Sequence, residues 1–291
     1  MSLILHVFIE QKKSISKLIA FSYQIKDMYT EARKGCHEHV EISKLIRDFA
    51  YAPHRYNSEA KVLLRLVITM DAVLTVACQV LAIRGPTSEE GKAITEMMEM
   101  IDDEVVLQLG MMAEATLELD SFVHFGDQSN LDEAELPEKQ DRLATIIHSL
   151  FVAGQCMHIP GVTSIALKIL RMPRTYIINN TLKTIGSSDG PSEAIVTRCL
   201  RRMSVWAKLA TSVIEAEFPD WEVVSNFKVF NLPLASQANV ALQRQAVSAE
   251  RKTCLRRLAK TIGVPEDELI AEFYHFEPFA MKQKAGELFK L

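Results

Sequence analysis

The sequence predicts an all-α protein, an irregular orthogonal bundle of about ten helices. Apolar residues recur three and four positions apart over most of the chain, which is the spacing of one face of an α-helix. Glycine and proline interrupt this pattern rarely, with 11 and 10 residues in a chain of 291. The one strand candidate is residues 176–185, where Asn179 and Asn180 suit the tight turn of a small β-hairpin.

Glycines, prolines and capping residues divide the N-terminal third into helices. A first helix has its apolar face over residues 15–29 and stops at Gly35, and a second, shorter helix ends before Pro53. A long apolar helix is predicted over residues 58–83, because Ser58 suits a helix start and Gly85-Pro86 a helix end.

Part of that helix, residues 66–83, has about the minimum length of a membrane span. It carries Asp71 and Gln79, which are costly in hydrocarbon, so we expect a central helix buried in the protein. No signal peptide is predicted, since the N-terminus has neither a basic leader nor a cleavage site. Five scattered cysteines without a CxxC pair favour a reducing, intracellular setting.

Acidic helices are predicted next. Thr87 and Glu90 fit a capping box that opens a helical region to about residue 117. Its broad apolar face holds several methionines, which pack in a core more often than they line a groove: Met97, Met98, Met100 and Met112. Residues 126–133 are predicted as a loop, and Pro137 suits the first turn of the following helix.

Residues 154–191 form the most interrupted part of the chain. The stretch from Gly186 to Pro191 is the best domain boundary, which gives a large helical unit, 1–186, and a smaller helical unit, 187–291. A single continuous domain is the alternative. Beyond the boundary, helices are predicted over 192–217, 220–230, 235–261 and 265–274, followed by a short tail helix.

Charge is sorted along the chain in a way that the net charge of −4 hides. Between residues 88 and 141, only Lys92 and Lys139 oppose a run of aspartates and glutamates. Two later helical segments are basic, one around 198–208 and one over 249–260. Local fields, more than totals, select charged partners.

The common enzymatic sites are weakly signalled. The chain has no GxGxxG and no GxxxxGK[ST] loop, which disfavours the usual nucleotide-driven chemistry. Cys36-His-Glu-His39 is the densest set of metal-capable residues, but adjacent positions on a helix point in different directions. We interpret this cluster as a solvated turn, and predict no metal and no cofactor.

Two further groups of residues could be chemically active, but each has a simpler structural explanation. Cys156 with His158 and His148 suggests a thiol–imidazole pair, whereas a buried cysteine is usually plain packing. Carboxylates over 102–120 would bind a divalent metal only in a rigid geometry, so we interpret them as a solvated helix face. These acids are Asp102, Asp103, Glu104, Glu114, Glu118 and Asp120.

The basic helices carry the main functional hypothesis, contact with nucleic-acid phosphates without sequence readout. Lys252, Arg256 and Lys260 lie four positions apart and therefore share one stripe of a helix. The predicted contact residues are Arg198, Arg201, Arg202, Arg251, Lys252, Arg256, Arg257 and Lys260. An equally weighted alternative docks these charges on the acidic helices of the same chain. A second alternative is a protein interaction scaffold, whose acidic, Met-rich helices offer a groove to a basic or amphipathic partner helix.

Two segments resemble the helical region inserted into the catalytic fold of hAT-type DNA transposases. In residues 54–66 an aromatic-x-Ser turn, Tyr56-Asn-Ser58, opens a long apolar helix. Residues 218–233, which begin Phe-Pro-Asp-Trp, are similar to the proline-led helix that closes that region. The resemblance covers residues 50–235, and the acidic helices between the two segments fit the order of the insertion.

The chain departs from that family outside the insertion. It shows no strands carrying the acids of a ribonuclease-H-like sheet, no paired ligands of a BED zinc finger and no C-terminal dimerisation signature. The resemblance therefore implies a transposase-derived helical fragment without a catalytic core, and no catalytic residue is carried over. We expect a non-enzymatic intracellular protein, nuclear in preference to cytoplasmic, that is not inserted in a membrane.

Overall fold

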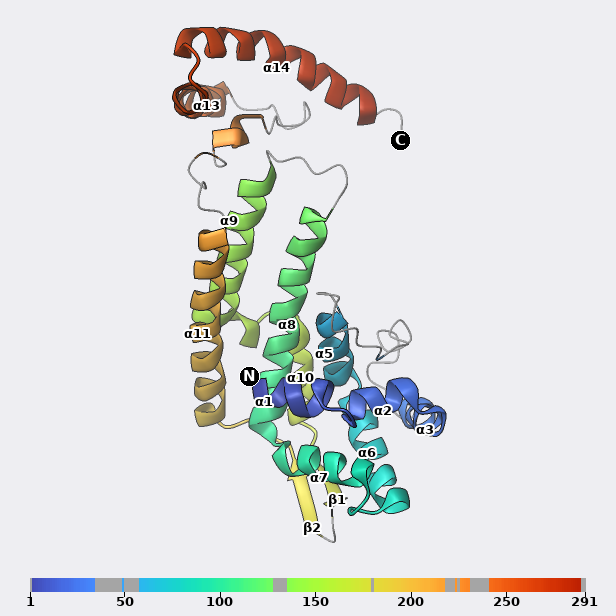
Figure 1. Cartoon of the computed structure of the whole chain (residues 1–291). Helices are drawn as coiled ribbons and strands as arrows, with labels where there is room; N and C mark the ends of the chain where they lie inside the picture. Colours follow the sequence, from blue (N-terminus) through green and yellow to red (C-terminus); the bar gives the residue numbers. More distant parts are fainter. Residues whose placement is uncertain are drawn as a thin grey trace. The chain divides into compact units, whose positions relative to one another are not determined.

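The computed structural model describes residues 2–34, 49, 58–127, 135–178, 181–217, 223, 226–230 and 241–288. Within these ranges the chain is all-α with one two-stranded antiparallel sheet, so the predicted fold class is confirmed (Figure 1). The α-helices are α1 (Ser2–Leu5), α2 (Ile15–Phe21), α3 (Tyr23–Lys34), α5 (Ser58–Ile68), α6 (Met70–Arg84), α7 (Glu89–Met100), α8 (Asp103–Gly126), α9 (Leu136–Ile147), α10 (Val162–Leu170), α11 (Glu193–Glu217), α13 (Ala241–Ile262) and α14 (Glu266–Leu288). Shorter helical turns lie at His6–Glu10, His148–Val152, Gln155–Met157 and Phe227–Phe230.

The internal contacts divide the chain into two compact units. Unit 1 comprises Met1–Val123 and Thr145–Leu209, and unit 2 comprises His124–Ala144 and Ala210–Leu291. Gly186, at the predicted boundary, lies within unit 1. Its N–H donates to Asp103 Oδ1 at 2.7 Å, and the next N–H, of Ser187, donates to the carbonyl of Leu170 at 2.8 Å.

Helix α6 forms the centre of unit 1, where it contacts α3, α5, α7 and β1. Most of its side chains are buried, as expected for a central helix. The predicted length is wrong, because the apolar run is broken at Thr69 into α5 and α6, which meet at 84°. Thr69 Oγ1 donates to the carbonyl of Arg65 at 2.7 Å and accepts from Tyr29 Oη at 2.9 Å. Such back-bonding by a threonine bends helices.

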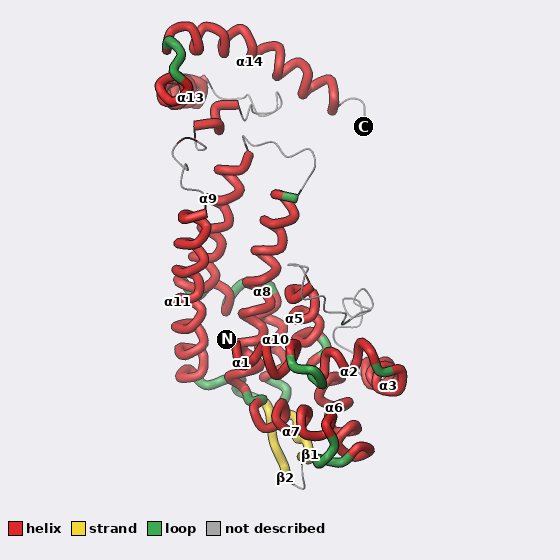
Figure 2. Tube along the Cα trace, viewed as in Figure 1, coloured by secondary structure: helices red, strands yellow, loops and turns green. Residues whose placement is uncertain are grey.

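The predicted hairpin is present and starts two residues earlier than expected, as β1 (Arg174–Ile178) and β2 (Thr181–Ile185) (Figure 2). A two-stranded hairpin is marginally stable alone. Here unit 1 holds it at both strands. Arg174 pairs with Asp71 of α6 at 2.8 Å, and Lys183 Nζ donates to the carbonyls of Met98 and Glu99 at the end of α7. A cation at that end complements the helix dipole.

The acidic region forms two helices that are capped differently from the prediction. Ser88, rather than Thr87, caps α7, since its Oγ accepts the N–H of Gly91 at 2.9 Å. Asp102 caps α8 by accepting the N–H of Val105 at 2.8 Å. Both residues satisfy N–H groups that a helix start leaves without intrahelical partners.

In unit 2, α13 and α14 follow one another along the chain and pack together as a helical hairpin, and Figure 1 shows α14 crossing α13, which is seen end-on. Its small core consists of Val229, Cys254, Leu255, Leu258 and Phe273. The helix predicted over 265–274 and the tail helix are one helix, which continues through Pro278. The predicted helix near 40–49 lies outside the described residues, apart from the buried Phe49.

Candidate nucleic-acid interface

Two of the predicted phosphate contacts on α11 are engaged inside unit 1. Arg198 donates through Nε and Nη2 to Glu104 Oε2, at 2.8 and 2.5 Å, and Arg202 Nη1 lies 2.5 Å from Glu104 Oε1. Glu104 of α8 retains 17% of its side-chain surface. One carboxylate of the acidic block thus neutralises two arginines of the first basic segment, which is the internal docking that the sequence left as an alternative.

The two arginines stabilise the charged form of Glu104. The Arg198 hydrogen bond, followed by that of Arg202, holds the pKa of Glu104 below its usual value, because both favour the charged carboxylate. Cys199 lies beneath it with its Sγ 3.6 Å from the carbonyl of Glu104. Burial raises the pKa of Cys199 to about 12, so this thiol stays protonated at neutral pH.

The second basic segment, on α13, finds its partners on α14 instead of the acidic helices of 88–141. Arg251 Nη1 pairs with Glu277 Oε1, and this pair is mostly withdrawn from solvent. Arg256 Nε lies 3.6 Å from Glu266 Oε2, with both side chains more than half exposed. An exposed ion pair at that distance is weak, and either side chain can leave it for another partner at little cost. The Arg251–Glu277 pair is mostly buried, so its loss would leave a poorly solvated charge.

The other cations of α13 remain at the surface. Lys252 Nζ lies 5.9 Å from the centroid of the Tyr274 ring, within the range of a cation–π contact. Arg257 and Lys260 are exposed, as is Arg201 on α11, and no ion-pair partner for these three occurs among the described residues. The opposite face of α13 carries Cys254, Leu255, Leu258 and Ala259, which are buried. The helix therefore presents a charged outer face.

Exposed aromatic side chains occur on α14 and were not predicted from the sequence; of these, Tyr274 lies beside this face. Tyr274, Phe276 and Phe279 are 43%, 47% and 62% exposed, whereas Phe273 is buried in the unit 2 core. A signal was present in the run Phe273-Tyr-His-Phe-Glu-Pro-Phe279. Aromatic residues at positions 273, 274, 276 and 279 point in different directions around a helix, so they cannot all lie on its buried face.

The interpretation of residues 102–120 as a solvated face is wrong for its key acids. Glu104 is paired as described, and Asp103 accepts the N–H of Gly186. Glu114 is buried and accepts from both the N–H, at 3.0 Å, and the hydroxyl of Thr163 in the first turn of α10. Gly161 makes room for this carboxylate, because a side chain there would overlap it.

The methionines that an interaction groove would require belong to the unit 1 core. Met97, Met98 and Met112 are buried, together with Ile101 of the same apolar face. The face is therefore already covered within the chain, which argues against the scaffold alternative.

The thiol–imidazole candidate lacks the geometry of an activated nucleophile. His148 and His158 are exposed while Cys156 is fully buried, and no hydrogen bond joins the thiol to either ring in this fully described part of the chain. Burial, reinforced by Glu114, raises the pKa of Cys156 to about 12. A nucleophilic thiolate needs the opposite shift.

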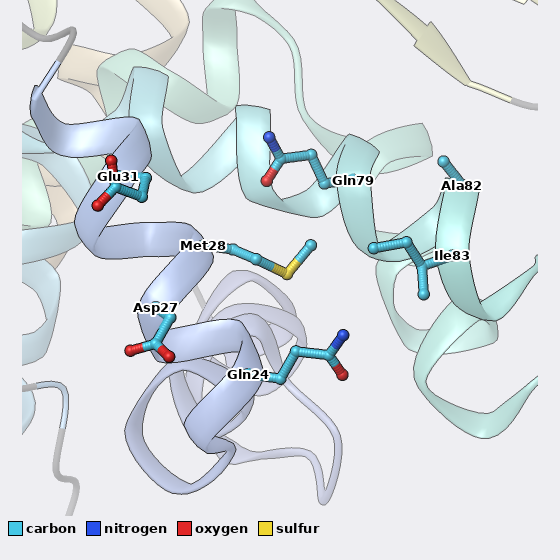
Figure 3. A pocket seen from close by; sticks show the side chains of 7 residues that line it. All are labelled: Gln24, Asp27, Met28, Glu31, Gln79, Ala82 and Ile83. Atoms are coloured by element: carbon cyan, nitrogen blue, oxygen red, sulfur yellow. The ribbon is translucent and has the colours of Figure 1, made fainter.

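A surface groove of about 600 Å³ lies between α3 and α6 (Figure 3). Met28, Ala82 and Ile83 supply apolar surface, and Asp27 and Glu31 lie along its α3 side. These carboxylates would repel a phosphate. The groove is therefore a poor candidate for nucleic acid, unlike the outer face of α13.

Within the described ranges, no group of three His, Cys, Asp or Glu side chains is placed to hold a metal ion. The Cys36-His-Glu-His39 cluster lies outside the described residues. No single described helix is long and apolar enough to cross a membrane, although α5 and α6 together would pass such a test of length and composition.

Comparison with models of protein families, with curated proteins and with solved structures finds no match to this chain. The resemblance to hAT-type transposases therefore stays a prediction. Both segments that carry it lie partly outside the described residues.

Proposed function

We propose that this protein binds nucleic acid through phosphate contacts made by the outer face of α13, without reading sequence. The observation that carries the proposal is the division of α13 into two faces. Cys254, Leu255, Leu258 and Ala259 are buried in unit 2, while Lys252, Arg256, Arg257 and Lys260 are exposed. Arginine and lysine on an exposed helix face are the groups that neutralise phosphates and release counterions.

The predicted phosphate contacts differ in whether they already have an ion-pair partner within the protein. Arg198, Arg202 and Arg251 have strong internal partners, so they contribute little to an external phosphate site. Glu266, Asp267 and Glu268 open α14 close to the end of α13, and they lower the positive potential around Lys260. The strongest contacts are therefore expected from Lys252, Arg256 and Arg257.

The test is fluorescence anisotropy of the full chain against duplex DNA and single-stranded RNA across a salt titration. Binding should weaken steeply with salt. The double variant Arg256→Ala/Arg257→Ala should reduce the slope of log affinity against log salt by about two, since each phosphate contact contributes about one.

The matched control is Lys26→Ala/Lys92→Ala, which removes the same charge from exposed positions of unit 1. Its salt slope should stay at the wild-type value. Equal slopes for the two double variants would show that binding follows net charge alone and would contradict a site on α13. Absence of binding at low salt would reject the proposed function.

A further inference from the structure

The proposed function leaves open which form of nucleic acid the α13–α14 hairpin prefers. Duplex binding through phosphates needs only cations, whereas proteins that bind single strands also supply aromatic rings on which bases stack. The arrangement of rings around the cationic stripe therefore bears on the choice.

Neighbouring members of the stripe of Lys252, Arg256 and Lys260 are four residues apart in sequence, which is about 6 Å along the helix axis. Tyr274 of the neighbouring helix lies against its first member, with its ring centroid 5.9 Å from Lys252 Nζ. The ring also packs edge-on against the buried Phe273, with centroids 6.4 Å apart. Tyr274 thus lies beside the first residue of the stripe while 43% of its surface stays exposed.

We infer that the α13–α14 hairpin binds single-stranded nucleic acid, with Tyr274 stacking on a base while Lys252 and Arg256 contact the adjoining phosphates. This inference rests on the proposed function and specifies its ligand. The weak, exposed pair of Arg256 with Glu266 exchanges for a phosphate at little cost. The ring gives a base a flat apolar partner, and such stacking tolerates any base.

The experiment separates base stacking from phosphate contact. Binding of the full chain is measured by anisotropy with oligothymidylate and with an abasic strand of the same length, about 12 nucleotides. The wild-type protein should prefer the strand with bases. Tyr274→Leu should lose about tenfold in affinity for oligothymidylate and change little for the abasic strand, which abolishes the preference. Tyr274→Phe keeps the ring and should retain it.

Phe279→Leu is the matched control, because it removes a more exposed ring from the same helix. Five residues separate it from Tyr274, so it points about 140° away around the helix. Its affinities should match those of the wild-type protein. Far-UV circular dichroism of each variant checks that the fold is retained.

The outcomes distinguish the two claims. If Tyr274→Leu changes neither affinity, or both equally, the stacking inference is wrong, while salt-dependent binding that needs Arg256 and Arg257 still supports the proposed function. If neither strand binds, both claims fail. Binding to phosphatidylserine vesicles that is lost in Phe279→Leu, with no preference between the strands, would assign the hairpin to an anionic lipid surface instead.

Discussion

Arg251 of α13 donates to Glu277 of α14 across the helical hairpin of unit 2, and the two side chains keep 18% and 19% of their surface exposed. This pair differs from the neighbouring Arg256–Glu266 pair, whose members are more than half exposed. Two arginines five positions apart on one helix thus have different roles. Arg251 joins the two helices, whereas the Arg256–Glu266 pair stays exposed to solvent.

Removal of the Glu277 carboxylate should destabilise unit 2. Glu277→Ala leaves the partly buried guanidinium of Arg251 without its partner, and we expect the free energy of unfolding to fall by about 2 kcal/mol. Urea denaturation followed by circular dichroism measures the change. Glu266→Ala, which breaks the exposed pair, should alter stability by less than about 0.5 kcal/mol. Equal losses in the two variants would contradict this ranking.

The Glu104 cluster should make stability depend on pH. Since the pKa of Glu104 is lowered in the folded protein, its contribution is complete above the carboxyl value of the unfolded chain, about 4.3. It is lost as the pH falls from there through the lower folded value. Glu104→Gln should therefore be less stable than the wild-type protein at pH 7, and the difference should shrink below about pH 4. A difference that grows on acidification would reverse the sign of the argument.

Gln108 of α8 is buried, and neither its amide oxygen nor its nitrogen has a hydrogen-bond partner in the part of the chain that the structure describes. An unpaired buried amide costs about 1–3 kcal/mol. Gln108→Met keeps the unbranched shape and removes this cost, so we expect a gain of about 1 kcal/mol, seen as a higher Tm. Gln155→Met, at an exposed position, should leave Tm nearly unchanged. A lower Tm for Gln108→Met would mean that the amide is satisfied.

Gly186 is required by both its backbone and its surroundings. Its φ is +84°, and an added Cβ would lie 2.7 Å from the carbonyl oxygen of Leu170. Gly186→Ala should therefore lose about 1–2 kcal/mol from backbone strain and more from the clash. Gly263 has a φ of +76° with open space around it, so Gly263→Ala isolates the strain alone. Denaturant unfolding should show the larger loss for Gly186→Ala; the reverse order would exclude the clash.

The elements that the sequence predicts well are those marked by local chemistry. The pair Asn179-Asn180 predicts the hairpin, which is present with β1 starting two residues early, and Gly85 predicts the end of α6, which is found there. The break at Thr69 has no comparable mark. It depends in part on a hydrogen bond from Tyr29, which is distant in sequence, and an apolar pattern read along the chain cannot contain it.

The same distinction applies to the candidate interface. The charge pattern predicts that some basic residues pair with acidic residues of the same chain. It does not predict which acidic residue pairs with which basic one. Glu104 is 94 residues from Arg198, and Glu277 is 26 residues from Arg251. Which arginines remain exposed is therefore a tertiary property. The exposed ring of Tyr274 is likewise defined by the burial of its neighbour Phe273.

Helix α10 carries its own anion. The first N–H groups of a helix attract phosphates in many proteins. In this helix the carboxylate of Glu114 already accepts the N–H and hydroxyl of Thr163 from within unit 1. A nucleic-acid strand arriving from solution would therefore meet a carboxylate at the start of α10, and under the proposed function its attraction to α13 would depend on discrete side-chain charges. Such charges can be removed one at a time, whereas a backbone dipole cannot.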